Sequence, residues 1–141
     1  MSDLEWSSDY NINIPAIDNE HKLIVSIVND ISRSMLHHGE LQLKIVSESL
    51  RLLSKCIRSH FESEERFLLM NNYPELEAHM EQHAGLLTIL AEFEQNFNAR
   101  NPTFTDEMLL FLKDWLVRHI ILHDSKIGHY YSENELSKDY V

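Results

Sequence analysis

The side chains in this sequence best suited to chemistry are histidines and a carboxylate spaced four residues apart. His60 and Glu64 form one pair, in the stretch HFESE, and His79 and His83 form another, in HMEQH. Residues i and i+4 share one face of a helix, so each pair directs two electron-pair donors toward one point. Imidazole nitrogens and carboxylate oxygens are common ligands of iron, zinc and manganese, so the two pairs predict a metal site.

Two further histidines, His21 and His119, each stand within an otherwise apolar helical stripe. A lone histidine on such a face is more often a core residue bonded to a carbonyl or carboxylate than a metal ligand. Because His21 and His119 occur together with the two pairs of candidate ligands, we interpret them as metal ligands as well. Other residues are interpreted more simply: Met35, Met108, Phe67, Phe93, Phe97 and Trp115 as core, His37, His38 and His129 as solvated, and Glu62, Glu65, Glu77 and Glu81 as surface charge.

The elements that must position these residues are four amphipathic helices. Apolar residues recur in steps of three and four from Ile17 to Met35, from Leu43 to Phe67, from Leu76 to Phe97 and from Met108 to Leu122. Short connections make neighbouring helices antiparallel. We therefore predict an all-α, up-down-up-down four-helix bundle in one domain, with an N-terminal arm (residues 1–16), the bundle (17–129) and a C-terminal tail (130–141).

The ends of the helices carry recognisable signals. We expect Asp18 or Asn19 to cap the first helix, Pro74 to occupy the first position of the third, Thr105 to cap the fourth and Gly128 to end it. The histidine-rich positions then fall early in the first and third helices and late in the second and fourth. In antiparallel neighbours these positions lie at one level, which predicts a single cluster. An unpaired buried polar group costs about 1–3 kcal/mol, so the cluster needs a common partner.

The ligand count exceeds the four that one tetrahedral zinc takes, so two metal ions fit better. Their positive charge needs carboxylates that bridge both ions, and Glu64 is one. For the second, spacing favours His123, because i+4 lies about 40° from His119 on an ideal helix and i+5 about 140°. Charge favours Asp124, since an imidazole adds no negative charge and does not bridge. We predict Asp124 as the ligand, in a widened π-type turn, with His123 beside the site or turned outward.

Composition narrows the class of protein. Twelve Lys and Arg against 23 Asp and Glu give a net charge of −11, which disfavours nucleic acid and anionic membranes as partners. The single cysteine, Cys56, excludes an intrachain disulfide and a multi-cysteine metal site. The opening MSDLEWSSDY resembles no signal peptide, and no run of apolar residues approaches a membrane span. We expect a cytoplasmic protein.

The order His, HxxxE, HxxxH, HxxxxD resembles that of the bacterial haemerythrins. The resemblance extends from Glu5 and Trp6 to about Lys126, and His123 departs from it, because a small or apolar residue is expected before the aspartate. It implies a four-helix bundle with a non-haem di-iron centre. His79, His83 and His119 would bind one iron and His21 and His60 the other. Glu64, Asp124 and an oxo or hydroxo group would bridge the two ions.

The resemblance implies reversible O₂ binding for carriage, storage or delivery, with an open position on the second iron. That position could also accept NO or small anions. Leu116 and Trp115 are expected to line the O₂ pocket, and the protein is expected to be a monomer and not an enzyme. Two alternatives stay open: a sensor of O₂, NO or redox state that signals through a partner, and a di-iron oxidase or peroxidase.

Overall fold

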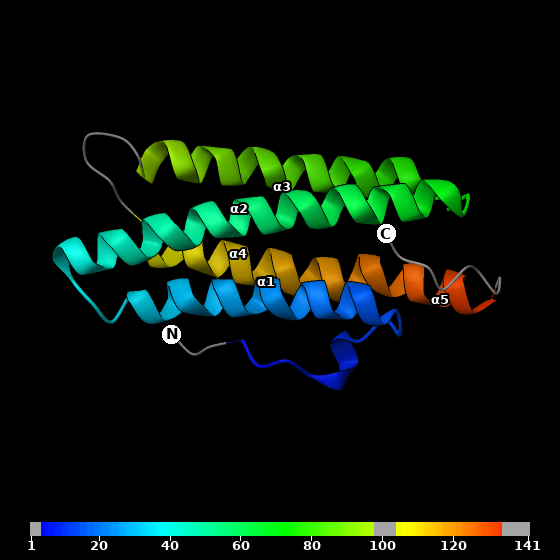
Figure 1. Cartoon of the computed structure of the whole chain (residues 1–141), viewed down its shortest axis with the longest axis horizontal. Helices are drawn as coiled ribbons and strands as arrows, with labels where there is room; N and C mark the ends of the chain where they lie inside the picture. Colours follow the sequence, from blue (N-terminus) through cyan, green and yellow to red (C-terminus); the bar gives the residue numbers. More distant parts are fainter. Residues whose placement is uncertain (1–3, 98–103, 134–141) are drawn as a thin grey trace.

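The computed structural model describes residues 4–97 and 104–133, and within them the chain is helical with no strand. Four antiparallel rods form a bundle in which each successive rod reverses direction (Figure 1). The rods are α1 (Pro15–Ser34), α2 (Gly39–Met70), α3 (Leu76–Phe97) and a composite fourth. The fourth consists of α4 (Asp106–Arg118), a π-helical turn η2 (His119–Asp124) and α5 (Ser125–Glu133). The predicted all-α, up-down-up-down bundle is confirmed.

Two apolar clusters fill the bundle, one on each side of a polar layer. The larger cluster includes Ile24, Leu53, Leu90 and Leu112, and the smaller one includes Ile17, Phe67 and Ile127. His21 of α1 lies between Ile17 and Ile24 in sequence, so one helix passes from one cluster through the polar layer into the other. The layer is therefore sealed along the bundle axis by apolar packing.

The N-terminal arm completes the smaller cluster. Ile12 and Ile14 are buried in it, and the short 3-10 helix η1 (Ser8–Tyr10) precedes them. The backbone N–H of Leu4 donates to Oδ1 of Asn29 at 2.8 Å, which ties the start of the described arm to α1. The expected arm is thus packed against the bundle along residues 4–14.

The helix ends agree with the sequence at one point and differ at three. Thr105 accepts a hydrogen bond from the backbone N–H of Met108 at 3.2 Å, which confirms it as the cap of α4. The caps predicted for α1 are wrong, because this helix begins at Pro15 and Asp18 instead accepts the N–H of Ile12 at 2.8 Å. Pro74 does not start α3, which begins at Leu76 after a turn.

Gly128 does not end the fourth rod, contrary to the prediction, since α5 continues to Glu133. Its role is close packing. A Cβ atom placed on Gly128 would lie 2.4 Å from the carbonyl oxygen of Ile12, a distance at which the backbones must shift. The arm can lie against α5 only because this residue has no side chain. Among the described helices, none is long and apolar enough to cross a bilayer.

We predict that Gly128→Ala lowers the free energy of unfolding by about 1–3 kcal/mol, because overpacking forces the arm away from α5. Gly85→Ala is the matched control. Gly85 also lies in a helix, and a Cβ there would meet nothing within 4 Å. This control should gain about 0.4–1 kcal/mol from helix propensity and reduced unfolded-state entropy. Urea unfolding of both variants tests the contrast, and a Gly128→Ala protein as stable as the parent would contradict it.

Candidate metal centre

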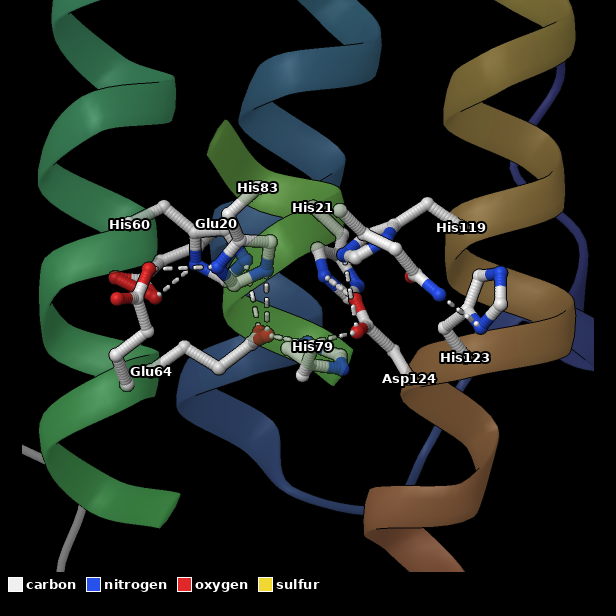
Figure 2. Close-up of polar contacts among 11 residues, drawn as sticks. Glu20, His21, His60, Glu64, His79, His83, His119, His123 and Asp124 are labelled. Carbon is white, nitrogen blue, oxygen red and sulfur yellow. Dashed lines mark hydrogen bonds and ion pairs between the residues drawn. The ribbon is translucent and has the colours of Figure 1, made fainter. Parts of the chain in front are cut away.

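Five histidines and two carboxylates form the polar layer, and all seven come from the sequence prediction. They are His21, His60, Glu64, His79, His83, His119 and Asp124, and none is more than 4 % exposed. Figure 2 shows them converging from all four rods toward the middle of the bundle. The structure thus brings together every residue that the sequence placed in the cluster.

Glu64 connects histidines from two helices. Its Oε1 lies 2.5 Å from Nε2 of His79 and 3.2 Å from Nε2 of His83, both on α3. Its Oε2 lies 3.1 Å from Nε2 of His60, on the same helix as Glu64. The two oxygens of one carboxylate therefore face two different sets of imidazoles.

Asp124 repeats this arrangement from the fourth rod. Its Oδ1 lies 3.1 Å from Nε2 of both His79 and His119, and its Oδ2 lies 2.8 Å from Nε2 of His21. The donors separate into two groups, each with ligand atoms within 4.8 Å of one another: Glu64 with His79, His83 and His119, and Glu64 with His21, His60 and Asp124. Each group is suited to one metal ion, and the carboxylates lie between the groups.

The donor set fits divalent metal ions better than it fits hydrogen bonds alone. Buried atoms without a hydrogen-bond partner among the described residues include Nε2 of His21, His60, His83 and His119, Oε2 of Glu64 and both carboxylate oxygens of Asp124. Several of these atoms lie close together but lack hydrogen-bond geometry. Each costs about 1–3 kcal/mol if it stays unsatisfied. Two cations placed between the nitrogens and oxygens would satisfy them together.

Two carboxylates outside the cluster orient histidines within it. Nδ1 of His60 lies 2.7 Å from Oε1 of Glu20, and Nδ1 of His83 lies 2.8 Å from Oε2 of Glu65. A proton on Nδ1, donated to the carboxylate, leaves the Nε2 lone pair free for a metal. The interpretation of Glu65 as surface charge is therefore wrong. No role is predicted for Glu20 from the sequence, because its position directly before His21 gives no signal of a contact with His60.

Aromatic rings hold two of the histidines in place. Phe61 stacks on His83 with centroids 3.6 Å apart and planes at 3°, and Trp115 stacks on His119 at 4.6 Å and 14°. Trp115 is half-buried, whereas Leu116 lies in the larger apolar cluster. Their expected role as the lining of an O₂ pocket stays a prediction.

The widened turn predicted between His119 and Asp124 is confirmed as the π-helical turn η2. The turn takes up one residue more than an α-helical turn, so Asp124 reaches the face that His119 occupies. Leu122 illustrates the effect on its neighbours. It belongs to the apolar stripe by spacing, but it is 55 % exposed.

His123 lies outside the ring of ligands, next to Asp124 (Figure 2). Its Nδ1 accepts a hydrogen bond from Nε2 of Gln82 at 3.0 Å. It belongs to neither group of metal ligands found among the described residues. Burial, followed by the neighbouring His119 and His79, lowers the pKa of His123, which favours the neutral form that accepts from Gln82. The structure thus agrees with the position expected for it.

Protons compensate the buried carboxylates when no metal is present. Burial alone would lower the pKa of His60 and His79, but the carboxylates around them outweigh it and raise both values to about 10. Burial and Asp124 would raise the pKa of Glu64, yet His60 and His79 hold it well below its ordinary value. The pKa of Asp124 is also held well below its ordinary value by His119 and His21, although burial alone would raise it. The two buried carboxylates are therefore stabilised by positive charge beside them.

Comparisons with known proteins match this arrangement. The family model "Hemerythrin HHE cation binding domain" matches residues 13–129. "Bacteriohemerythrin" of Pseudomonas aeruginosa is 31 % identical over 146 residues, covering 99 % of this chain and 90 % of that protein. "Bacteriohemerythrin" of Methylococcus capsulatus is 26 % identical over 129 residues, covering 91 % and 96 %. A solved structure, "Crystal structure of hemerythrin:wild-type", superposes with a TM-score of 0.82 at 25 % identity, covering 89 % and 95 %.

We predict that Asp124→Asn loses at least one of two bound metal ions, because it removes negative charge from between both groups of donors. Losses of ligands or their partners commonly weaken metal binding about 10–100-fold. His123→Leu should retain both ions. Metal content after dialysis measures the difference. If His123→Leu lost metal while Asp124→Asn kept it, spacing rather than charge would determine the ligand.

We also predict that the metal-free protein loses stability as the pH rises from about 6.5 to about 10. His60 and His79 have pKa values raised from 6.5 to about 10, so their stabilising protons are fully present below the unfolded value and lost toward the folded one. Metal-bound imidazoles are neutral, so the loaded protein should not show this decline. Melting temperatures of both forms across this range provide the test, and parallel curves would disprove the charge argument.

Proposed function

The chain belongs to the haemerythrin family of proteins that bind O₂ at a di-iron centre, and we propose that it binds O₂ reversibly, for carriage, storage or delivery. The observation that carries this proposal is the placement of Glu64 and Asp124, each with one oxygen toward each group of histidines. A single metal ion needs no such pair of bridges. Two buried ions do, because neutral imidazoles leave their charge uncompensated.

We propose the following ligands for the two irons. His79, His83 and His119 would bind one ion and His21 and His60 the other, and Glu64 and Asp124 would hold both ions together with an oxo or hydroxo group. The two groups of donors support this division, since the three-histidine group and the two-histidine group share Glu64. Asp124 lies near Nε2 of histidines from both groups. The ion held by His21 and His60 would have one histidine fewer than the other, and we propose that O₂ would bind there.

When bound, the two irons supply O₂ binding by passing between the ferrous and ferric states. The chain supplies the surroundings. Glu20 and Glu65 hold the Nδ1 protons of His60 and His83, so that both rings face inward as neutral ligands. Leu116 lies buried in the larger apolar cluster and Trp115 covers one face of the His119 ring, so both would make the surroundings of the centre more apolar.

The crowding of the site favours binding over catalysis. Seven side chains, almost without exposure, fill the layer between two apolar clusters, which favours a small ligand over an organic substrate. We therefore propose that the protein is not an enzyme, and that NO or small anions compete for the open position. The monomeric state and cytoplasmic location expected from the sequence stay predictions.

We predict two iron atoms per chain, no haem, and a visible spectrum that changes on passing from argon to air and returns when O₂ is removed. Metal analysis and anaerobic absorption spectra provide the measurements. His38→Ala, a change at the exposed start of α2, is the control and should behave as the parent. One zinc per chain would refute the di-iron site. A permanent spectral change would instead favour redox sensing or an oxidase.

A further inference from the structure

Two hydrogen bonds join proposed metal ligands to carboxylates at the edge of the cluster. Nδ1 of His60 lies 2.7 Å from Oε1 of Glu20 (Figure 2), and Nδ1 of His83 lies 2.8 Å from Oε2 of Glu65. The first bond crosses from α2 to α1 and the second from α3 to α2. Both distances are typical of an N–H group that donates to an ionised acceptor.

The two bonds are divided evenly between the two groups of donors. His83 belongs to the three-histidine group and His60 to the two-histidine group. Each group also contains a ring without such a bond, since Nδ1 of His119 and Nδ1 of His21 have no hydrogen-bond partner among the described residues. Packing therefore holds rings in this cluster without a carboxylate, and the two carboxylates need a further reason.

The carboxylates differ from the rings in their contact with solvent. The side chains of Glu20 and Glu65 are 33 % and 26 % exposed, whereas those of His60 and His83 are 3 % and 1 % exposed. Contact with water lets a carboxylate carry its negative charge without the cost of full burial. Each ring therefore connects a charge at the edge of the bundle to a metal position in its interior.

A carboxylate bonded to one nitrogen of an imidazole makes the other nitrogen a stronger electron donor to a metal. A stronger donor stabilises ferric iron relative to ferrous iron, which lowers the reduction potential. In the proposed function, O₂ takes one electron from each of the two irons as it binds and returns both electrons as it leaves. A carboxylate behind one ring on each ion would therefore favour the oxygenated form.

We propose that Glu20 and Glu65 set the O₂ affinity of the centre, each by strengthening electron donation from its histidine to one of the two ions. Both are positioning residues, since neither carboxylate belongs to the donor groups. Glu20 acts on the ion held by His21 and His60, at which we propose that O₂ binds. This inference rests on the proposed di-iron function and adds to it what determines the strength of binding.

Glutamine at either position separates the charge from the hydrogen bond. Glu20→Gln and Glu65→Gln keep an oxygen that can accept the Nδ1 proton, but they remove the negative charge. We expect each variant to keep two irons and to raise the dissociation constant for O₂ about tenfold, the lower end of what loss of such a partner costs. The reduction potential should rise by about 30 mV, which is a tenfold change for a two-electron couple.

Glu62→Gln is the matched control. Glu62 is exposed on the same helix as Glu65, so this change alters the net charge equally and should leave the O₂ affinity and the reduction potential unchanged. Proton–nitrogen NMR spectra of the histidine rings in the zinc-loaded protein give a readout that needs neither iron nor O₂. Slowly exchanging Nδ1 protons of His60 and His83 should be present in the parent, and each should shift upfield without disappearing in its glutamine variant.

Glutamine variants with the parent's O₂ affinity and reduction potential would overturn the inference, because the carboxylates would then only hold the rings. Loss of iron from these variants, or absence of the two Nδ1 protons from the parent, would overturn it as well. In each of these cases, reversible O₂ binding by the parent would leave the proposed function standing. A parent without two irons, or without reversible O₂ binding, would refute the proposed function and the inference together.

Discussion

The constraint on which the structure depends is the burial of two carboxylates among five imidazoles, between two apolar clusters. Glu64 and Asp124 are fully buried, and neither is compatible with an apolar interior unless positive charge lies beside it. Metal ions supply that charge in the loaded protein, and protons on His60 and His79 supply it otherwise. Every rod contributes to this layer, so the packing of the bundle and the assembly of the site depend on each other.

Much of the fold and of the cluster could be predicted because both follow from helical periodicity. The steps of three and four that mark the core also place His21, His60, His79 and His119 in line with it. Contacts between helices are not visible in that pattern. Glu65 lies one residue past Glu64, off the inward face by spacing, yet its carboxylate reaches across to His83 on α3. The role of Gly128 could not be predicted for a similar reason, since the residue it packs against, Ile12, is more than a hundred residues away in sequence.

In the fourth rod, the need for negative charge predicts which residue faces the centre, whereas helical periodicity does not. An ideal helix would present His123 to the centre and turn Asp124 away. The π-helical turn η2 reverses this arrangement, so that Asp124 faces the centre. Its carboxylate supplies negative charge between the two groups of donors, which an imidazole cannot supply. The displaced residues then form the outer edge of the site: Leu122 faces solvent, and His123 accepts a hydrogen bond from Gln82. The turn that brings Asp124 to the centre thus also determines which residues lie at the surface around it.

Anomalous diffraction at the iron edge, from crystals of the iron-loaded protein, tests the central claim most directly. The account predicts two peaks in each chain, one among His79, His83 and His119 and one between His21 and His60. Glu64 and Asp124 should each place one oxygen on each peak. A single peak, or a peak bound by His123 with Asp124 turned away, would contradict it.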